Sequence, residues 1–168
     1  WRNRKMITFY ERLVRVLFTR YNGLVRYWLT FNEINMILHA PFLGAGIVFE
    51  TDEDKAQVTY TAAHHELVAS ALATKIAKEI NPDFQIGCML AAGQYYPDSA
   101  NPLDVQEAAD KNRESFFFSD VQVRGYYPSF ALKKQEREGI VIPFESGDTE
   151  LLRDNTVDFV SISYYQSR

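Results

Sequence analysis

Residues 28–33 read WLTFNE, an apolar run that stops abruptly at an Asn-Glu pair. A β-strand of about five or six residues that begins near Val25 would place Asn32 and Glu33 at or just past its C-terminal end. In α/β proteins, active sites gather at that end of the strands. An amide can both donate and accept hydrogen bonds, and a carboxyl in a partly apolar setting can keep its proton near neutral pH. The pair therefore suits an acid that acts on a hydroxylated substrate such as a sugar.

Glu33 also has a simpler interpretation. A Glu after a strand is most often a solvated loop residue or the first-turn acid of the next helix. Position alone favours this interpretation, so the catalytic one depends on the wider pattern of the chain.

A helix is predicted before this strand and a long loop after it. Apolar residues recur at helical spacing ahead of the strand, and Asn22-Gly23 gives the stop signal. The residues that define the spacing are Phe9, Leu13, Val16, Leu17 and Tyr21. Residues 32–54 form the loop, and a loop of that length inside a compact domain usually carries function.

The rest of the chain alternates between helical and strand patterns. Helices are predicted over Ala56–Ile80, Pro102–Ser119 and Ser129–Glu138, followed by a short helix capped by Ser146 or Asp148 that ends near Asn155. Strands are predicted over Phe84–Leu90 and Val157–Ser163. This order is typical of parallel βα units with right-handed crossovers, so the fold class is α/β.

Composition limits the possible partners and the compartment. With 168 residues, of which 46% are hydrophobic, the chain is long enough to bury the core of one domain. A formal charge of −4 gives no basic footprint for nucleic acid, and no apolar run approaches the roughly 20 residues that cross a membrane. The single Cys88 excludes an internal disulfide and lies in an apolar run, so we expect a core residue in a reducing, cytoplasmic compartment. Because the chain starts at Trp1, we expect that processing or truncation has removed earlier residues.

The segment Tyr27–Glu33 resembles the acid/base motif of family-one glycoside hydrolases, which are retaining β-glycosidases built on a (β/α)8 barrel. The continuation Ile34-Asn35, followed by the residues at 39–42 and 44–46, is similar to the 6-phospho-β-glucosidase branch of that family. Further matches follow in family order along effectively the whole chain. They are His64-His65-Glu66 at a helix start, Val123–Pro128 as an RG-x-YP turn, and Val157–Tyr165 as the sixth barrel strand.

The resemblance implies a partial TIM (β/α)8 barrel that contains about strands four to six of eight, with residues 1–168 as a single fragment of that barrel domain. An isolated piece of this kind would leave two sheet edges and part of the barrel interior uncovered. We therefore expect the chain to associate with itself or with missing barrel segments.

The resemblance also assigns roles. A retaining glycosidase uses one carboxyl as acid and then base, and a second about 5–5.5 Å away as nucleophile. By motif match Glu33 is the catalytic acid/base, Asn32 binds the sugar 2-hydroxyl, and Tyr165 touches the nucleophilic carboxylate. That nucleophile belongs to a seventh strand outside this chain, so the isolated chain is predicted to be inactive. The implied substrate is a phosphorylated β-glucoside, and the implied chemistry uses no metal and no organic cofactor.

Several alternatives stay open. His39 could shape the leaving-group side of the site or simply pack its loop. His64 and His65 are adjacent, so they point about 100° apart on a helix and cannot clamp one ion; packing or capping is the expected role. As a second function class, the chain could be a binding or structural module that keeps the scaffold without the chemistry. A gene that continues beyond Arg168 into a strand ending in a Glu motif would favour the hydrolase.

Overall fold

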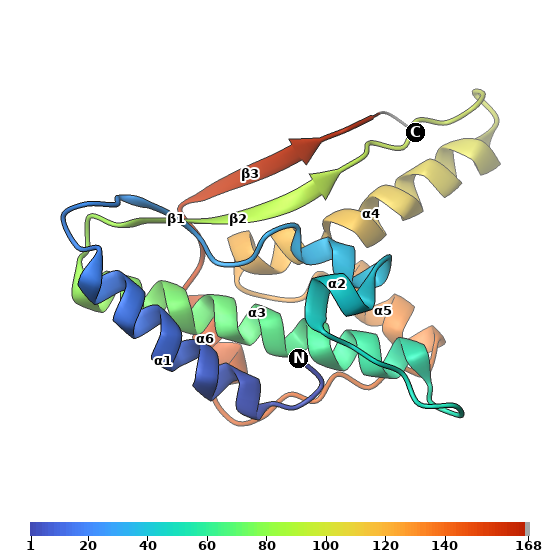
Figure 1. Cartoon of the computed structure of the whole chain (residues 1–168). Coiled ribbons are helices and arrows are strands. Elements are labelled where there is room, and N and C mark those ends of the chain that lie inside the picture. The colour runs from blue at the N-terminus through green and yellow to red at the C-terminus, as the bar shows by residue number, and fades with distance from the viewer. Residues whose placement is uncertain (167–168) are drawn as a thin grey trace.

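The computed structural model describes residues 1–166, and its three strands form one parallel sheet. The strands are β1 (Tyr27–Leu29), β2 (Gln85–Ala92) and β3 (Phe159–Tyr164), in the spatial order β1-β2-β3. Tyr27 pairs with Gln85, and Gly87 pairs with Phe159. The predicted α/β class with parallel strands is confirmed, and Figure 1 shows β2 and β3 running in the same direction.

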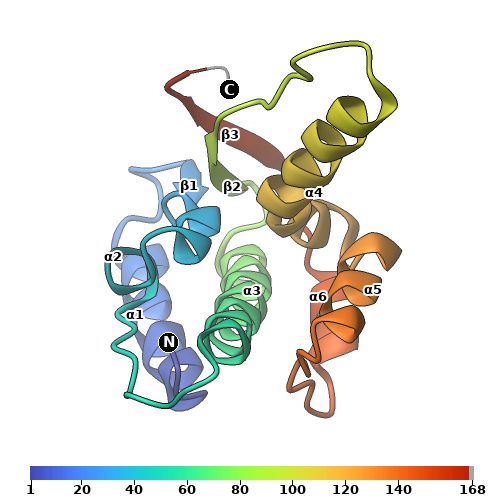
Figure 2. The ribbon, with the colours of Figure 1, turned by 90° about the vertical axis from the view of Figure 1, so that its right-hand side faces the viewer.

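Helices cover one side of this sheet, as the two views in Figures 1 and 2 show. Helix α3 carries the chain from β1 to β2, and the segment with α4, α5 and α6 carries it from β2 to β3. The helices are α1 (Lys5–Arg20), the 3-10 helix η1 (Ile34–Leu38), α2 (Pro41–Ala45), α3 (Lys55–Ile80), α4 (Pro102–Arg124), α5 (Ser129–Arg137) and α6 (Asp148–Asp154).

The core lies between β2 and the helices. Alternate residues of β2, namely Ile86, Cys88 and Leu90, are buried against them. Helix α3 is buried along most of its length, and its many alanines let α1 approach it closely. The core position predicted for Cys88 is confirmed, and burial raises the pKa of its thiol to about 11. At neutral pH the thiol is therefore protonated and is a poor nucleophile.

The predicted elements are all present, but several boundaries differ. The strand β1 has only three residues, and the predicted loop 32–54 contains η1 and α2. Helix α4 runs five residues past Ser119 and ends at Gly125, whose φ of 77° suits glycine. A Cβ at that position would lie 2.6 Å from the Cα of Arg153, so the close approach of α6 also requires glycine there.

The predicted cap of α6 is wrong. The N-cap residue is Gly147, with a φ of 92°, and no side chain caps the helix. Asp148 instead directs its carboxylate to Arg4 and His64, which lie far away in the sequence. The charged Arg4 guanidinium and the buried His64 ring are stronger hydrogen-bond donors to this carboxylate than the free amides of a seven-residue helix.

Apolar side chains are exposed on both flanks of the molecule. On α1, the predicted helix is confirmed, but Phe9, Leu13 and Val16 are 52–62% exposed, and the face that packs inward is Ile7, Val14 and Phe18. On β3, Val160 and Ile162 are 50% and 57% exposed although they share a face with buried residues of β2. Within residues 1–166, no helix has the length and apolar character to cross a membrane.

Candidate active site

Glu33 occupies an unusual backbone position just after β1. Its φ and ψ of 48° and 52° are left-handed, and it is the one non-glycine residue with positive φ in the part of the chain that the structure describes. The carbonyl of Glu33 accepts a hydrogen bond of 2.8 Å from the amide of Met36, which starts η1. This conformation costs about 1–3 kcal/mol and persists only where the surroundings enforce it, as they do at functional sites.

A cavity of about 350 Å³ lies at the C-terminal ends of the strands and contains Glu33. Its walls come from segments far apart in the sequence: Glu33, Met36 and His39 after β1, residues 91–93 and Tyr95 at the end of β2, Ser115 of α4, and Tyr165 and Gln166 after β3. The convergence of three strand ends on one concave site is the arrangement expected of a (β/α)8 active site.

A larger groove of about 710 Å³ runs between α4 and α5, on the outer helices. Its charged walls are largely paired, as in Lys111 with Glu107 and Lys134 with Glu114. It contains no residue from a strand end. We therefore take the smaller cavity as the candidate active site, because chemistry in this architecture belongs to the strand ends.

Two of the three predicted site residues meet in this cavity. The Tyr165 phenol donates a hydrogen bond of 2.6 Å to Oε1 of Glu33, and this bond raises the pKa of Tyr165. The resemblance implied a contact of Tyr165 with the nucleophilic carboxylate, whereas here the phenol contacts the acid itself. Asn32 is exposed and does not line the cavity, so the structure leaves it beside the site rather than in it. His39 is exposed and lines the cavity, which fits both of its predicted roles.

Asn35, two residues after Glu33, does not itself line the cavity, and the sequence analysis gave it no role. It is 2% exposed, and its Oδ1 accepts from the Ala91 amide while its Nδ2 donates to the Ala91 carbonyl, both at 2.9 Å. The same Nδ2 donates to Oγ of Ser115 at 3.2 Å. The sequence did offer one signal for this role. The Asn35 side-chain amide lies between Ile34 and Ile37, which are both buried, and a polar side chain in such an apolar turn needs hydrogen-bond partners.

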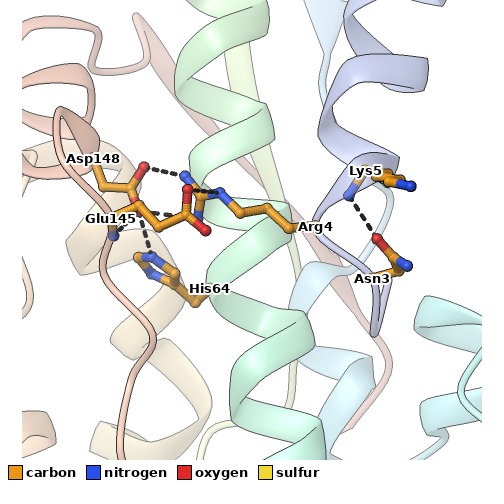
Figure 3. Close-up of polar contacts among 6 residues, drawn as sticks. All are labelled: Asn3, Arg4, Lys5, His64, Glu145 and Asp148. Carbon is orange, nitrogen blue, oxygen red and sulfur yellow. Dashed lines mark hydrogen bonds and ion pairs between the residues drawn. The ribbon is translucent and has the colours of Figure 1, made fainter.

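A second polar cluster lies among α3, α6 and the N-terminal segment (Figure 3), and we call it the Asp148 cluster. The buried His64 contacts the Tyr127 hydroxyl through Nδ1 at 3.0 Å and Oδ2 of Asp148 through Nε2 at 3.1 Å. Arg4 donates to both oxygens of Asp148 and pairs with Glu145 at 3.0 Å. Burial lowers the pKa of His64, so the neutral ring donates from Nε2 to Asp148 and accepts from Tyr127.

The predicted packing role of the two histidines is thereby confirmed for His64. The neighbouring His65 donates from Nδ1 to the Trp1 carbonyl at 2.9 Å, on another side of the helix. In residues 1–166, no three His, Cys, Asp or Glu side chains are grouped so that they could hold a metal ion.

Comparison with known proteins gives the class. The sequence profile of Glycosyl hydrolase family 1 matches residues 1–168, and the chain belongs to this family. Among its relatives, the 6-phospho-beta-glucosidase AscB of Escherichia coli (strain K12) is 58% identical over 168 residues, which are all of this chain and 35% of AscB. The aryl-phospho-beta-D-glucosidase BglH of Bacillus subtilis (strain 168) is 51% identical over 99% of this chain and 36% of its own length.

Solved structures of the same family have a similar fold. The family 1 β-glucosidase of Thermotoga maritima superimposes with a TM-score of 0.80 at 26% identity, covering 99% of this chain and 37% of that one. The chain thus spans about a third of the length of the relatives that it matches. The resemblance to the 6-phospho-β-glucosidases in the sequence analysis is confirmed, and the three strands are consistent with part of a TIM barrel.

Proposed function

We propose that this chain supplies the acid/base section of a retaining hydrolase that cleaves the β-glucosidic bond of 6-phospho-β-glucosides. The observation that carries the proposal is the placement of Glu33, in a strained left-handed turn at a strand end, facing a cavity and bonded to Tyr165. In this role Glu33 protonates the leaving oxygen and later removes a proton from the attacking water. Asn32 binds the sugar 2-hydroxyl once substrate fills the cavity.

The nucleophile comes from further polypeptide in this proposal. A retaining mechanism needs a second carboxylate about 5–5.5 Å from the first, and Glu33 is the one carboxylate among the described residues that line the cavity. Residues 1–168 are then a single section of a larger barrel domain. Sequencing the gene past Arg168 tests this: we expect a seventh strand that ends in a Glu motif, and a stop codon directly after Arg168 would contradict it.

The phosphorylated sugar is inferred from the names of the relatives and from the resemblance of residues 34–46 to their branch. A site built around a charged group leaves its polar partners unpaired when that group is missing. The whole gene product should therefore have a kcat/KM at least about 100-fold higher for 4-nitrophenyl 6-phospho-β-glucoside than for the unphosphorylated glucoside. The reverse preference would refute the phosphorylated substrate while leaving the role of Glu33 in place.

A direct test of Glu33 uses what we call the AscB graft, which is AscB with this chain in place of its 168 matched residues. A Glu33→Ala variant of the graft should release an activated aryl alcohol and then stall, because water lacks its base. Azide needs no base, so with a 6-phospho-β-glucoside it should restore turnover and yield the 6-phospho-β-glucosyl azide. If azide has no effect, Glu33 is not the acid/base.

We also propose that the chain alone is inactive and associates with itself. The exposed apolar residues of α1 and β3 would be covered by neighbouring helices in a closed barrel, and in the isolated chain they are available to a second copy. Light scattering should therefore give a mass above 19.4 kDa. The double variant Val160→Lys and Ile162→Lys should reduce association, and Leu103→Lys, at an exposed position on α4, is the matched control.

A further inference from the structure

We propose that Asn35 is a positioning residue for Glu33, because its amide fixes the turn that carries the acid to the neighbouring strand. This inference rests on the acid/base role proposed above. This turn is the start of η1: Glu33 is the N-cap of that 3-10 helix, and Asn35 is its second residue. The same segment also meets the main chain of β2 through the Thr30 amide, which donates to the Gly87 carbonyl at 3.4 Å.

The amide of Asn35 is fully used. It has one acceptor and two donor hydrogens, and these are matched by the Ala91 amide, the Ala91 carbonyl and the Ser115 hydroxyl. The side chain is buried, and buried hydrogen bonds of this kind are costly to lose because each abandoned group stays unpaired. Ile34 and Ile37, which are 3% and 0% exposed, anchor the same turn in the core.

Glu33 depends on such support more than an ordinary side chain does. Its backbone is in a conformation that it would leave if released, and its carboxylate has one hydrogen-bond partner among residues 1–166. That partner, Tyr165, is itself 73% exposed. The direction of the carboxyl is therefore set mainly by the turn, and displacement of a catalytic group by about 1 Å can cost on the order of 100-fold in rate.

A nearby residue provides a matched control. Asn112 of α4 makes the same pair of bonds to Tyr95, accepting from its amide and donating to its carbonyl, both at 2.9 Å. Tyr95 also lines the cavity, but it carries no acid. An Asn→Asp change at either position keeps the size and the acceptor and removes the donors. The two variants therefore differ only in the segment affected, which carries Glu33 in one case and Tyr95 in the other.

The experiment measures kcat/KM of the AscB graft on two 6-phospho-β-glucosides, one with a poor methanol leaving group and one with a good dinitrophenol leaving group. Asn35→Asp should lower kcat/KM about 10- to 100-fold for the methyl substrate and less than about 3-fold for the aryl substrate, because only the first needs a well-placed proton donor. Asn112→Asp should lower both by similar factors. Glu33→Gln, as reference, should show a larger difference than Asn35→Asp.

Equal losses for the two substrates with Asn35→Asp, or the same inequality with Asn112→Asp, would overturn the positioning role. If Asn35→Asp does not fold, Ser115→Ala decides: it removes one of the three bonds, and a 2- to 5-fold selective loss on the methyl substrate is expected, whereas no selective loss overturns the proposal. If Glu33→Gln itself shows no difference between substrates, the proposed acid/base function has failed, and the two failures are thereby distinguished.

Discussion

The cavity around Glu33 and the Asp148 cluster are both rich in polar groups, but they differ in how completely these groups are paired. The Asp148 carboxylate is 4% exposed and accepts hydrogen bonds from Arg4, His64 and the amide of Glu145. Glu33 is half-buried, faces a cavity and has the exposed Tyr165 as its partner. Full pairing stabilises a fold, whereas an incompletely paired acid in a strained turn remains available to a substrate.

The largest difference between the two regions is expected in how a substitution changes catalytic activity. In the AscB graft, Glu33→Gln should lower kcat/KM for the methyl 6-phospho-β-glucoside by about 10²- to 10⁴-fold, because an amide cannot donate the required proton. The melting temperature should stay within about 2 °C of the parent, since the Glu33 side chain does not pack in the hydrophobic core. A large fall in melting temperature would mean that Glu33 stabilises the fold, as the residues of the Asp148 cluster do.

Asp148→Asn should have the opposite profile. Removing this charge leaves the Arg4 guanidinium with the more exposed Glu145 as its carboxylate partner and weakens the bond to His64, so the free energy of unfolding should fall by about 3 kcal/mol. The ratio of kcat/KM between the two substrates should not change. Asp154→Asn is the control, because its pair with Arg153 is exposed to solvent and should contribute little to stability. Urea unfolding curves of the parent graft and of the two variants measure the changes in stability, and kinetic assays on the two substrates measure the ratio.

Glu66 tests whether a buried carboxyl without full pairing is tolerated only as a neutral acid. It is 1% exposed, its Oε1 has no hydrogen-bond partner, and burial raises its pKa to about 8. A raised pKa means that its contribution to stability is complete below about pH 4.5 and is lost as the pH rises through 8. Glu66→Gln should therefore stabilise the graft by about 1–3 kcal/mol at pH 8.5 and much less at pH 4.5. Equal effects at both pH values would contradict the buried acid.

The smallest effect is expected from His64. Burial lowers its pKa in the folded state, against the opposing influence of Asp148 and with smaller contributions from His65 and Arg4. Stability from the neutral ring is then complete above about pH 6.5 and is lost as the pH falls below that value. Between pH 7.5 and 5.5 the graft should lose about 1 kcal/mol more than its His64→Asn variant does. If the variant loses as much as the parent, protonation of His64 does not matter.

The comparison also shows which features a sequence can predict. The order of helices and strands follows from local periodicity, and Glu33 was found because an apolar run in the sequence stops just before it and a family motif surrounds it. The inward face of α1 could not be chosen from the sequence, because Phe9 and Leu13 on one side are as apolar as Ile7 and Val14 on the other. Only the position of α3 decides between them.

Long-range hydrogen bonds explain the remaining errors. Asp148 was a reasonable helix cap by local rules, but Arg4 and His64 lie 144 and 84 positions away and take its carboxylate. The amide of Asn35 meets Ala91 across 56 positions, so the local pattern indicates that this amide needs a partner but cannot say which residue it is. Side chains that join distant segments are therefore the features that required the structure.

The left-handed backbone of Glu33 has an evolutionary consequence. Glycine adopts that conformation freely and asparagine does so more readily than glutamate, so either replacement at position 33 would relax the turn while removing the carboxyl. A lineage that no longer used the cavity would gain stability by losing Glu33, and the residue should be among the first to drift. Under the proposed acid/base role, selection for activity is what would keep glutamate there against the preference of the backbone.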